Sequence, residues 1–231
     1  MSTAFIGKDI AHKALDDHYI VVGFFTPDYR PLAAAFARNL FAHSAPFHLY
    51  AVPGGAWDEI ILEKPAIVER AMTDYPGRKI ILMDVDCTLH GYLGNWAKDQ
   101  TADVVLPARI RQGRRRHGRV LFSSRVILFA PTRPAAALAA AWGRRCAEAD
   151  VPPFGRLCDE RELVGAIGEA HGATLAFTED AYAGLNARNA PPNAKITHES
   201  ARAKTDTWTT DLGKVGQRAF DVLRGKRPRA L

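Results

Sequence analysis

The segment that decides the fold is Lys79-Ile80-Ile81-Leu82-Met83-Asp84-Val85-Asp86-Cys87-Thr88. Its apolar run predicts a buried strand. In a strand Asp84 and Asp86 project from the same face, and two carboxylates that close repel each other unless a cation lies between them. The alternative is that they only cap a strand in solvent, which the apolar run directly before them disfavours. The segment therefore predicts a divalent-metal site at the end of a buried strand.

A strand–helix–strand–helix pattern precedes this segment. Residues 19–25 form a continuous β-branched and aromatic run typical of a buried parallel strand, and residues 47–52 form a second one. A helix is expected from about Tyr29. Another is expected from Lys64-Pro65, because proline suits the first turn of a helix. This order is typical of an α/β sheet with right-handed crossovers.

The rest of the chain predicts a mixed sheet, because its strands are shorter and less regular. Strands are expected at 103–106, 120–129 (one long or two short), 174–177 and 195–198, helices at 135–148, 160–171 and 212–223, a helical lead-in over 1–18 and a loop at Trp57. We therefore expect a single Rossmann-like α/β domain over residues 1–231, with a mixed, mainly parallel central sheet flanked by helices.

Composition indicates an ordinary globular chain. It has 231 residues, 47% of them hydrophobic, which suffices for one domain with a sizeable core. No window approaches the roughly 20 uncharged apolar residues of a membrane span, and the N-terminus lacks the pattern of an export signal. The three cysteines have no CxxC spacing and suggest neither a disulfide framework nor a zinc site. We therefore expect a cytoplasmic protein.

The net charge of +6 raises the question of an anionic partner. Much of the excess lies in residues 109–119 and in a basic tail over residues 224–231. The arginines of the first segment are Arg109, Arg111, Arg114, Arg115, Arg116 and Arg119. They could form a solvated flexible loop, clamp a phosphorylated or acidic acceptor, or bind nucleic acid or an anionic membrane surface. The flexible loop is favoured, because charge runs are usually solvated and neither segment has interleaved aromatic residues for base stacking.

Polar residues follow two of the expected strands. Ligands of open α/β sheets bind beyond the carboxyl ends of the strands. Thr26 and Asp28 follow the first strand and Asp84 and Asp86 the third, so all four could line one crevice. Oxygen ligands with open positions suit Mg²⁺ or Mn²⁺, and these ions usually complete their shell with phosphate oxygens.

Two families resemble parts of this sequence. Asp84-Val85-Asp86-Cys87-Thr88-Leu89 resembles the first motif of haloacid-dehalogenase-type phosphatases, which implies a nucleophilic Asp84 and a general acid Asp86. That motif normally follows the first strand of its domain, whereas a whole βαβ region precedes it here. No convincing downstream lysine and acidic pair follow in order; the nearest acidic pairs are Asp159-Glu160 and Glu179-Asp180. This phosphatase and a basic nucleic-acid-binding protein built on residues 109–119 are the alternative interpretations.

Residues 19–204 resemble more fully the nucleotide-diphospho-sugar transferases with the glycosyltransferase A-type fold. Asp84-Val85-Asp86 matches their DxD motif, and Lys64-Pro65 matches the lysine that opens the helix before it. Thr26 and Tyr29 stand where such enzymes leave the first strand and contact the nucleotide.

The order of the later parts also resembles this superfamily. Residues 103–106 match its next strand, and residues 128–142 match the strand and tryptophan-containing helix after it. Asp159-Glu160 stands where many relatives have Asp-Gln. The segment Ile196-Thr197-His198-Glu199-Ser200-Ala201-Arg202-Ala203-Lys204 resembles the closing His, Ser-Arg and Lys pattern.

The resemblance implies a metal-dependent hexosyltransferase that uses Mn²⁺ or Mg²⁺, takes a sugar from a nucleotide-diphosphate donor and passes it to a glycan, protein or small-molecule acceptor. It implies that Asp86 and His198 hold the metal and that Asp84 binds the metal or the ribose. The implied donor-binding residues are Thr26, Tyr29, Lys64, Asp84, Arg202 and Lys204. Asp159 or Glu160 would contact the acceptor hydroxyl or act as the catalytic base.

These roles have plainer structural alternatives. A lone histidine such as His198 is more often a polar packing residue, Lys64 can be a solvated helix start, and Asp159-Glu160 can stabilise a helix N-terminus. Trp142 is expected to be core packing and Cys87 a bystander.

The chain departs from the superfamily at two places. Relatives often have Ser-Gly where this chain has Ser124-Arg125, and glutamine where it has Glu160. Both positions lie near the acceptor in the family, so the resemblance does not carry over the identity of the acceptor.

Overall fold

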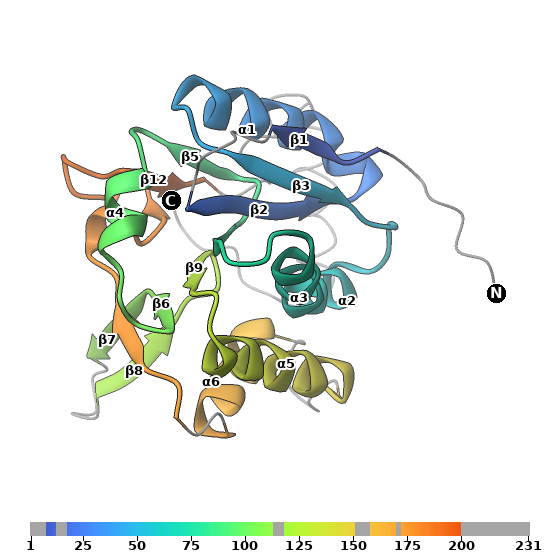
Figure 1. Cartoon of the computed structure of the whole chain (residues 1–231), viewed down its shortest axis with the longest axis vertical. Coiled ribbons are helices and arrows are strands. Elements are labelled where there is room, and N and C mark those ends of the chain that lie inside the picture. The colour runs from blue at the N-terminus through green and yellow to red at the C-terminus, as the bar shows by residue number, and fades with distance from the viewer. Residues whose placement is uncertain (1–7, 13–17, 113–117, 151–157, 170–171, 200–231) are drawn as a thin grey trace, which may run out of the picture. The chain divides into compact units, whose positions relative to one another are not determined.

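The computed structural model describes residues 8–12, 18–112, 118–150, 158–169 and 172–199, and these residues contain a seven-stranded sheet flanked by helices (Figure 1). The sheet has the strand order β1-β3-β2-β4-β9-β6-β10. Its strands are β1 (Ile10–His12), β2 (Tyr19–Phe25), β3 (Phe47–Ala51), β4 (Lys79–Met83), β6 (Val104–Leu106), β9 (Val126–Phe129) and β10 (Leu175–Phe177).

The sheet is mixed and mainly parallel, as predicted. β2 pairs in parallel with both β3 and β4, and β6 pairs in parallel with β10. β9 is antiparallel to its two neighbours β4 and β6, and β1 is antiparallel to β3. The strands β2, β3, β4, β6 and β10 therefore end at the same edge of the sheet.

Helices cover both faces of the sheet. The longer helices are α1 (Arg30–Ala42), α3 (Lys64–Asp74), α5 (Arg133–Ala147) and α6 (Asp159–Glu169); the shorter ones are η1 (Pro27–Tyr29), α2 (Trp57–Ile60), η2 (Ile61–Glu63), α4 (Gly94–Asp99) and η3 (Asp180–Tyr182). One core cluster includes Phe36 of α1 and the other includes Val68 of α3 and Leu138 of α5. Because both faces are buried, the central strands read as continuous apolar runs.

Two smaller sheets accompany the central one. The first has the order β11-β12-β5, formed by β11 (Leu185–Asn186), β12 (Ile196–His198) and β5 (Cys87–Leu89). The second is an antiparallel pair of β7 (Ala108–Gln112) and β8 (Gly118–Phe122). The expected strand region 120–129 is thus two short strands, one in this pair and one in the central sheet.

The structure corrects three sequence-based expectations. The lead-in over 1–18 contains the strand β1, and Trp57 begins a short helix, where the Ala56 amide donates to the Glu59 carboxylate and the Glu59 amide donates back to the Ala56 carbonyl. Such reciprocal bonding starts a helix without an apolar stripe to signal it. The expected loop over residues 109–119 is in part a strand pair, because residues 109–112 and 118–119 belong to β7 and β8.

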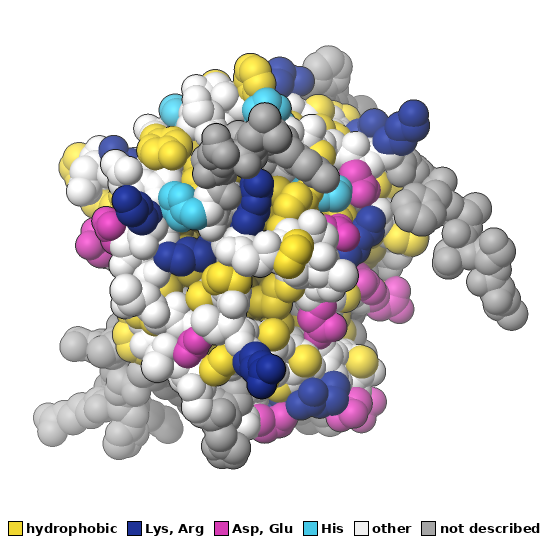
Figure 2. Space-filling view, in the orientation of Figure 1, with side chains coloured by type: hydrophobic (Ala, Val, Ile, Leu, Met, Phe, Trp, Pro, Cys, Tyr) yellow, Lys and Arg dark blue, Asp and Glu magenta, His cyan; other side chains and the backbone are white. Residues whose placement is uncertain are grey.

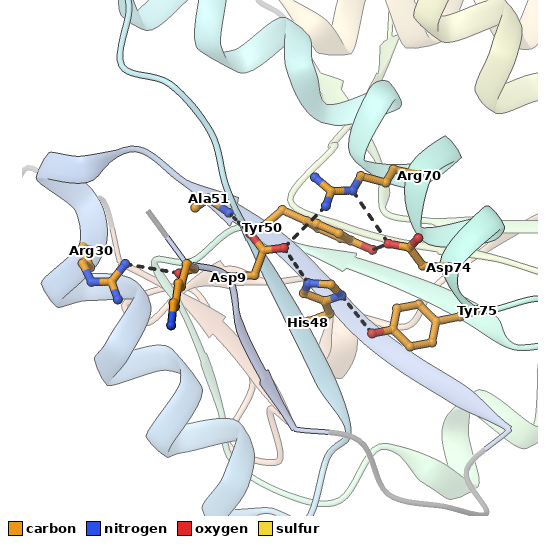
Figure 3. Close-up of polar contacts among 9 residues, drawn as sticks. Asp9, Arg30, His48, Tyr50, Ala51, Arg70, Asp74 and Tyr75 are labelled. Carbon is orange, nitrogen blue, oxygen red and sulfur yellow. Dashed lines mark hydrogen bonds and ion pairs between the residues drawn. The ribbon is translucent and has the colours of Figure 1, made fainter. Parts of the chain in front are cut away.

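β1 pairs with β3 through the backbone, and polar contacts around Asp9 add to this pairing (Figure 3). One Asp9 carboxylate oxygen accepts the Ala51 amide at 2.8 Å, and the other lies 3.0 Å from His48 Nε2. His48 Nδ1 lies 2.8 Å from the Tyr75 hydroxyl, which links the strand to the end of α3. A three-residue strand with little apolar surface had no periodicity by which to predict it.

Several expectations concern parts of the chain that the structure does not describe. Residues 1–198 form one compact unit. The expected helix over 212–223, the basic tail over 224–231 and the single-domain boundary at 231 lie outside the described residues and stay predictions. Within the described part, every helix is too short or too polar to cross a membrane.

Charged side chains are unevenly spread on the face of the described part seen in Figure 1. In the space-filling view, Asp and Glu gather mainly on the side of α2, α3 and α5, whereas Lys and Arg are spread across the face (Figure 2). The side chains of residues 109–119 are not described, so their predicted roles as a solvated loop, an acceptor clamp or a nucleic-acid or membrane surface are untested.

Candidate functional site

The candidate site lies at the edge where the parallel strands end. Asp84 follows β4, Thr26 follows β2, and the antiparallel β9 brings Arg125, the residue before it, to the same edge. The Asp84 amide donates to the Arg125 carbonyl at 3.0 Å, which fixes the backbone at the first aspartate. Strand direction alone therefore brings these three segments together.

Asp84, Asp86 and His198 form a cluster, although His198 is far from the aspartates in sequence. One ligand atom from each lies within 4.8 Å of the others, and His198 Nε2 is 3.1 Å from Asp86 Oδ2. Antiparallel pairing of β12 with β5 causes this, because it sets His198 opposite Cys87, the residue after Asp86. Two carboxylates and one imidazole are a donor set that suits Mn²⁺ or Mg²⁺ with open positions.

The small sheet that positions His198 is itself anchored to α1 by Asn39. The Asn39 amide group donates to the Leu89 carbonyl at 2.9 Å, and its oxygen accepts the Leu89 amide at 2.7 Å. The side chain thereby replaces a strand partner on the free edge of β5. Sequence reasoning missed Asn39; its only signal is a poor helix former inside a helix.

Lys64 is buried and contacts the carboxylates of both Asp84 and Asp159. Its ammonium lies 2.9 Å from Asp84 Oδ1 and 3.2 Å from Asp159 Oδ2, and it donates to Ser124 Oγ at 2.9 Å. The side chain is only 8% exposed. The prediction that Lys64 binds the donor directly is not tested, but the ammonium is already engaged by three partners here, which makes it a positioning group for two carboxylates.

Burial and charge shift the protonation equilibria of this pair. Burial lowers the pKa of Lys64, but the carboxylates of Asp84 and Asp159 outweigh it, so the lysine pKa lies above its ordinary value. Burial raises the pKa of Asp84, Lys64 lowers it in part, and the nearby Asp86 raises it again, for a net upward shift. An additional cation beside Asp84 and Asp86 would relieve this repulsion.

Asp159 and Glu160 differ in environment although they are adjacent. Asp159 is 5% exposed and its carboxylate faces Lys64. Glu160 is half-buried, and its Oε1 accepts the Ser124 amide at 3.4 Å. Both lie in the first turn of α6, where acidic residues favour the helix dipole. Of the two carboxylates, that of Glu160 is the more exposed.

Thr26 and Tyr29 lie beside the cluster on the neighbouring strand end. The Thr26 hydroxyl donates to the Asp28 carboxylate, and the Tyr29 amide donates to the Thr26 carbonyl at 3.0 Å. Gly23 allows β2 to approach β4 closely because glycine has no Cβ. A Cβ at this position would lie 2.7 Å from the Met83 carbonyl oxygen. The predicted nucleotide contacts of Thr26 and Tyr29 are untested.

Four further residues were singled out from the sequence, and the structure describes two of them. Trp142 is fully buried, as predicted for core packing, and its indole N–H donates to the Asp159 carbonyl at 3.0 Å. Cys87 is buried, and burial together with the nearby carboxylates raises the pKa of its thiol well above the ordinary range, which agrees with a bystander role. Arg202 and Lys204 lie outside the described residues.

A cavity of about 380 Å³ opens next to Glu160. It is lined by Pro107, Leu121, Phe122, Ser123, Arg125, Cys158, Glu160, Arg161, Val164, Ala183 and Leu185. Ser124 accepts from Lys64 and donates to Glu160, so it links the Lys64–Asp84 pair to a residue that lines the cavity. The volume is that of a site for a small molecule.

No protein-family model matches the chain. No curated protein matches it in sequence. Solved structures do resemble it in fold. A glycosyltransferase involved in the glycosylation of the major capsid of PBCV-1 superposes with a TM-score of 0.59 at 14% identity, covering 84% of this chain and 100% of that one.

Two further structures show the same likeness. The galactosyltransferase LgtC in complex with donor and acceptor sugar analogs has a TM-score of 0.51 at 13% identity, covering 92% of this chain and 97% of that one. The glycosyltransferase GlyE of Streptococcus pneumoniae TIGR4 has a TM-score of 0.53 at 13% identity, covering 87% of this chain and 59% of that one. At these identities the likeness is one of fold.

Proposed function

We propose that this chain, which has the glycosyltransferase A-type fold, is a metal-dependent glycosyltransferase that takes a sugar from a nucleotide-diphosphate donor. The observation that carries the proposal is the cluster of Asp84, Asp86 and His198, whose ligand atoms lie within 4.8 Å of one another at the ligand-binding edge of the sheet. The fold likeness to glycosyltransferases over most of the chain supports it.

The site suits this reaction because of where negative charge develops. Breaking the bond between the sugar and the diphosphate leaves an electron pair, and hence charge, on the departing phosphate oxygen. A Mn²⁺ or Mg²⁺ ion held by the cluster would supply Lewis-acid stabilisation of that charge. The protein's own part is to hold Asp84 by Lys64 and by the Arg125 carbonyl, and to hold His198 beside Asp86 through the pairing of β12 with β5.

On the acceptor side, we assign Glu160 the contact with the attacking hydroxyl. Its side chain lines the cavity, whereas Asp159 is committed to Lys64. As the acceptor oxygen bonds to the sugar, Glu160 would accept its proton. We further propose a hexosyl donor, by analogy with the galactosyltransferase among the structures of similar fold. The sequence resemblance adds Arg202 and Lys204, which lie outside the described residues, as proposed donor-binding residues.

The fold favours this function over the phosphatase alternative. The similar structures are glycosyltransferases.

The test is nucleotide release from a panel of UDP- and GDP-hexoses, with Mn²⁺ and with a chelator. We expect release by the wild-type chain only with Mn²⁺, near-complete loss in Asp86→Ala, and no change in Asp99→Ala, whose carboxyl is exposed at the end of α4. If the wild type binds no nucleotide sugar in the presence of Mn²⁺ and Asp86→Ala changes nothing, the proposal fails. Turnover of 4-nitrophenyl phosphate that disappears in Asp84→Asn would instead support the phosphatase.

A further inference from the structure

The cavity beside Glu160 has exposed apolar side chains in its walls. Leu121 of β8 and Val164 of α6 line it, and each is 45% exposed. Phe122, also in the lining, packs against Phe177 with ring centroids 6.1 Å apart, and Phe177 is 62% exposed. Single exposed apolar residues are normal, but here several gather around one concave site. An alkyl or aryl group on the ligand would remove this apolar surface from water.

The same cavity also has charged side chains in its walls. Its charged lining residues are Arg125, Arg161 and Glu160. Arg161 Nε is paired with Glu162 at 2.7 Å. Arg125 is half-buried, and no hydrogen bond or ion pair of its guanidinium to another described residue is seen, although its backbone carbonyl accepts the Asp84 amide. A guanidinium without a partner in the described part of the chain presents a planar fork of donors that suits a carboxylate or phosphate.

The position of this arginine places the charge next to the reacting groups. Arg125 follows Ser124, which donates its amide to Glu160 and accepts from Lys64. A ligand in the cavity could therefore present a hydroxyl to Glu160 and an anionic group to Arg125 at the same time. The apolar walls would receive the remainder of the molecule.

We propose that the acceptor carries both an apolar group and an anionic group, and that Arg125 is the specificity residue that binds the anion. This inference rests on the proposed glycosyl transfer in that it takes the ligand to be the acceptor. The chemistry of the ligand follows from the cavity alone. It also gives a physical meaning to the arginine at a place where the resembling family often has glycine.

The experiment compares three probes by ligand-observed NMR titration of the full chain with Mn²⁺. They are 4-nitrophenyl β-glucuronide, which has both groups, 4-nitrophenyl β-glucoside, which lacks the anion, and methyl β-glucuronide, which lacks the aryl group. We expect the first probe to bind about tenfold more tightly than either of the others. A factor of about ten in affinity is what one charge-assisted hydrogen bond or one well-buried apolar contact contributes. Arg125→Gln should abolish the advantage over the glucoside, and Leu121→Ser should reduce the advantage over the methyl glucuronide. Arg38→Gln, an exposed arginine of α1, is the matched control and should preserve the order.

Equal binding of the three probes would overturn the inference, as would an Arg125→Gln variant that binds glucuronide and glucoside with unchanged relative affinity. If Arg125→Gln weakens nucleotide-sugar binding and leaves the three probes alone, Arg125 belongs to the donor and the inference is wrong. Failure of the proposed function is separable: a chain that binds the aryl glucuronide through Arg125 but releases no nucleotide with Mn²⁺ keeps this binding site and loses the transferase.

Discussion

Lys64 and Asp84 form an ion pair with 2.9 Å between Nζ and Oδ1, and the side chains are 8% and 24% exposed. The same ammonium lies 3.2 Å from Asp159 at the start of α6. Lys64 opens α3, so this one cation ties together α3, the end of β4 and α6. The Asp84 side of the candidate site and the start of α6 beside the cavity are thereby coupled through a single charge.

Replacing Lys64 by methionine should destabilise the fold strongly. It leaves two carboxylates in a low-dielectric site without their cation, and removing one partner of a buried pair typically costs about 3–5 kcal/mol. Urea unfolding at neutral pH measures this loss. Lys98→Met, an exposed lysine in α4, is the control and should change the free energy of unfolding by less than about 0.5 kcal/mol.

A second variant separates charge from packing. Lys64→Met combined with Asp159→Asn removes one of the two unpaired charges, so it should recover part of the lost stability. A single variant as stable as the Lys98→Met control would show that the pair contributes nothing to folding. A double variant no more stable than the single one would show that lost packing, not charge, is the cause.

The metal cluster predicts Mn²⁺ binding that can be measured without any substrate. Asp86→Asn and His198→Gln should each weaken Mn²⁺ binding by at least the roughly 10- to 100-fold seen when outer partners of metal ligands are removed. Titration followed by electron paramagnetic resonance reports free Mn²⁺ directly.

The matched control for this measurement is His90→Gln. His90 follows β5, close to His198, but its Nε2 lies 2.8 Å from the Thr197 hydroxyl rather than in the cluster. Equal losses in His90→Gln and His198→Gln would mean that the small sheet, and not a ligand, had been disturbed. Unchanged Mn²⁺ affinity in Asp86→Asn would show that the cluster is not a metal site.

The sequence was sufficient to predict the strand at Asp84 because an apolar run followed by acidic residues is a local pattern. It was also sufficient for the mixed sheet and for most helix positions, since these depend on periodicity. It could not by itself place His198 beside Asp86, because that contact depends on the register of β12 against β5. Here the family resemblance supplied what the local pattern lacked.

Pairing within the site was beyond sequence reasoning for the same reason. The three partners of Lys64 come from the residue after β4, the link before β9, and the start of α6, and only the packed fold brings them to one ammonium. The adjacent residues Asp159 and Glu160 likewise cannot be told apart in burial from the sequence. The burial of Asp159 and the partial exposure of Glu160 follow from which face of α6 packs on α5.

Asp103 predicts a pH-dependent contribution to stability. One carboxylate oxygen accepts the Thr132 hydroxyl at 2.5 Å, and the other accepts the Thr174 hydroxyl at 2.7 Å and amide at 2.8 Å. Thr132 also caps α5, so Asp103 joins the starts of β6, α5 and β10. These hydrogen bonds, that of Thr132 foremost, lower the pKa of Asp103 below its ordinary 3.8.

Because the folded-state pKa is lowered, this stabilisation is complete above pH 3.8 and is lost as the pH falls through the folded-state pKa. Asp103→Asn should therefore be less stable than wild type at pH 7, by about 1 kcal/mol, and the difference should shrink as the pH is lowered below the ordinary value. Urea unfolding across pH measures it, with the exposed Asp150→Asn as control. A difference that stays constant with pH would show that the charge of Asp103 is not involved.

The contacts of Asp9 predict that β1 can be released without unfolding the rest of the sheet (Figure 3). β1 has three residues, of which Ala11 and His12 are exposed and Ile10 is half-buried against the core, so its apolar burial is limited to one side chain. Asp9→Ala leaves the Ala51 amide and His48 Nε2 without their acceptor, which should cost about 1–3 kcal/mol locally. Hydrogen exchange should then rise at β1 and at the edge of β3 that faces it, while amides of β2 and β4 keep their protection. Uniformly faster exchange across all four strands would mean that Asp9 stabilises the whole sheet, and unchanged exchange at β1 would mean that backbone pairing with β3 suffices to hold it.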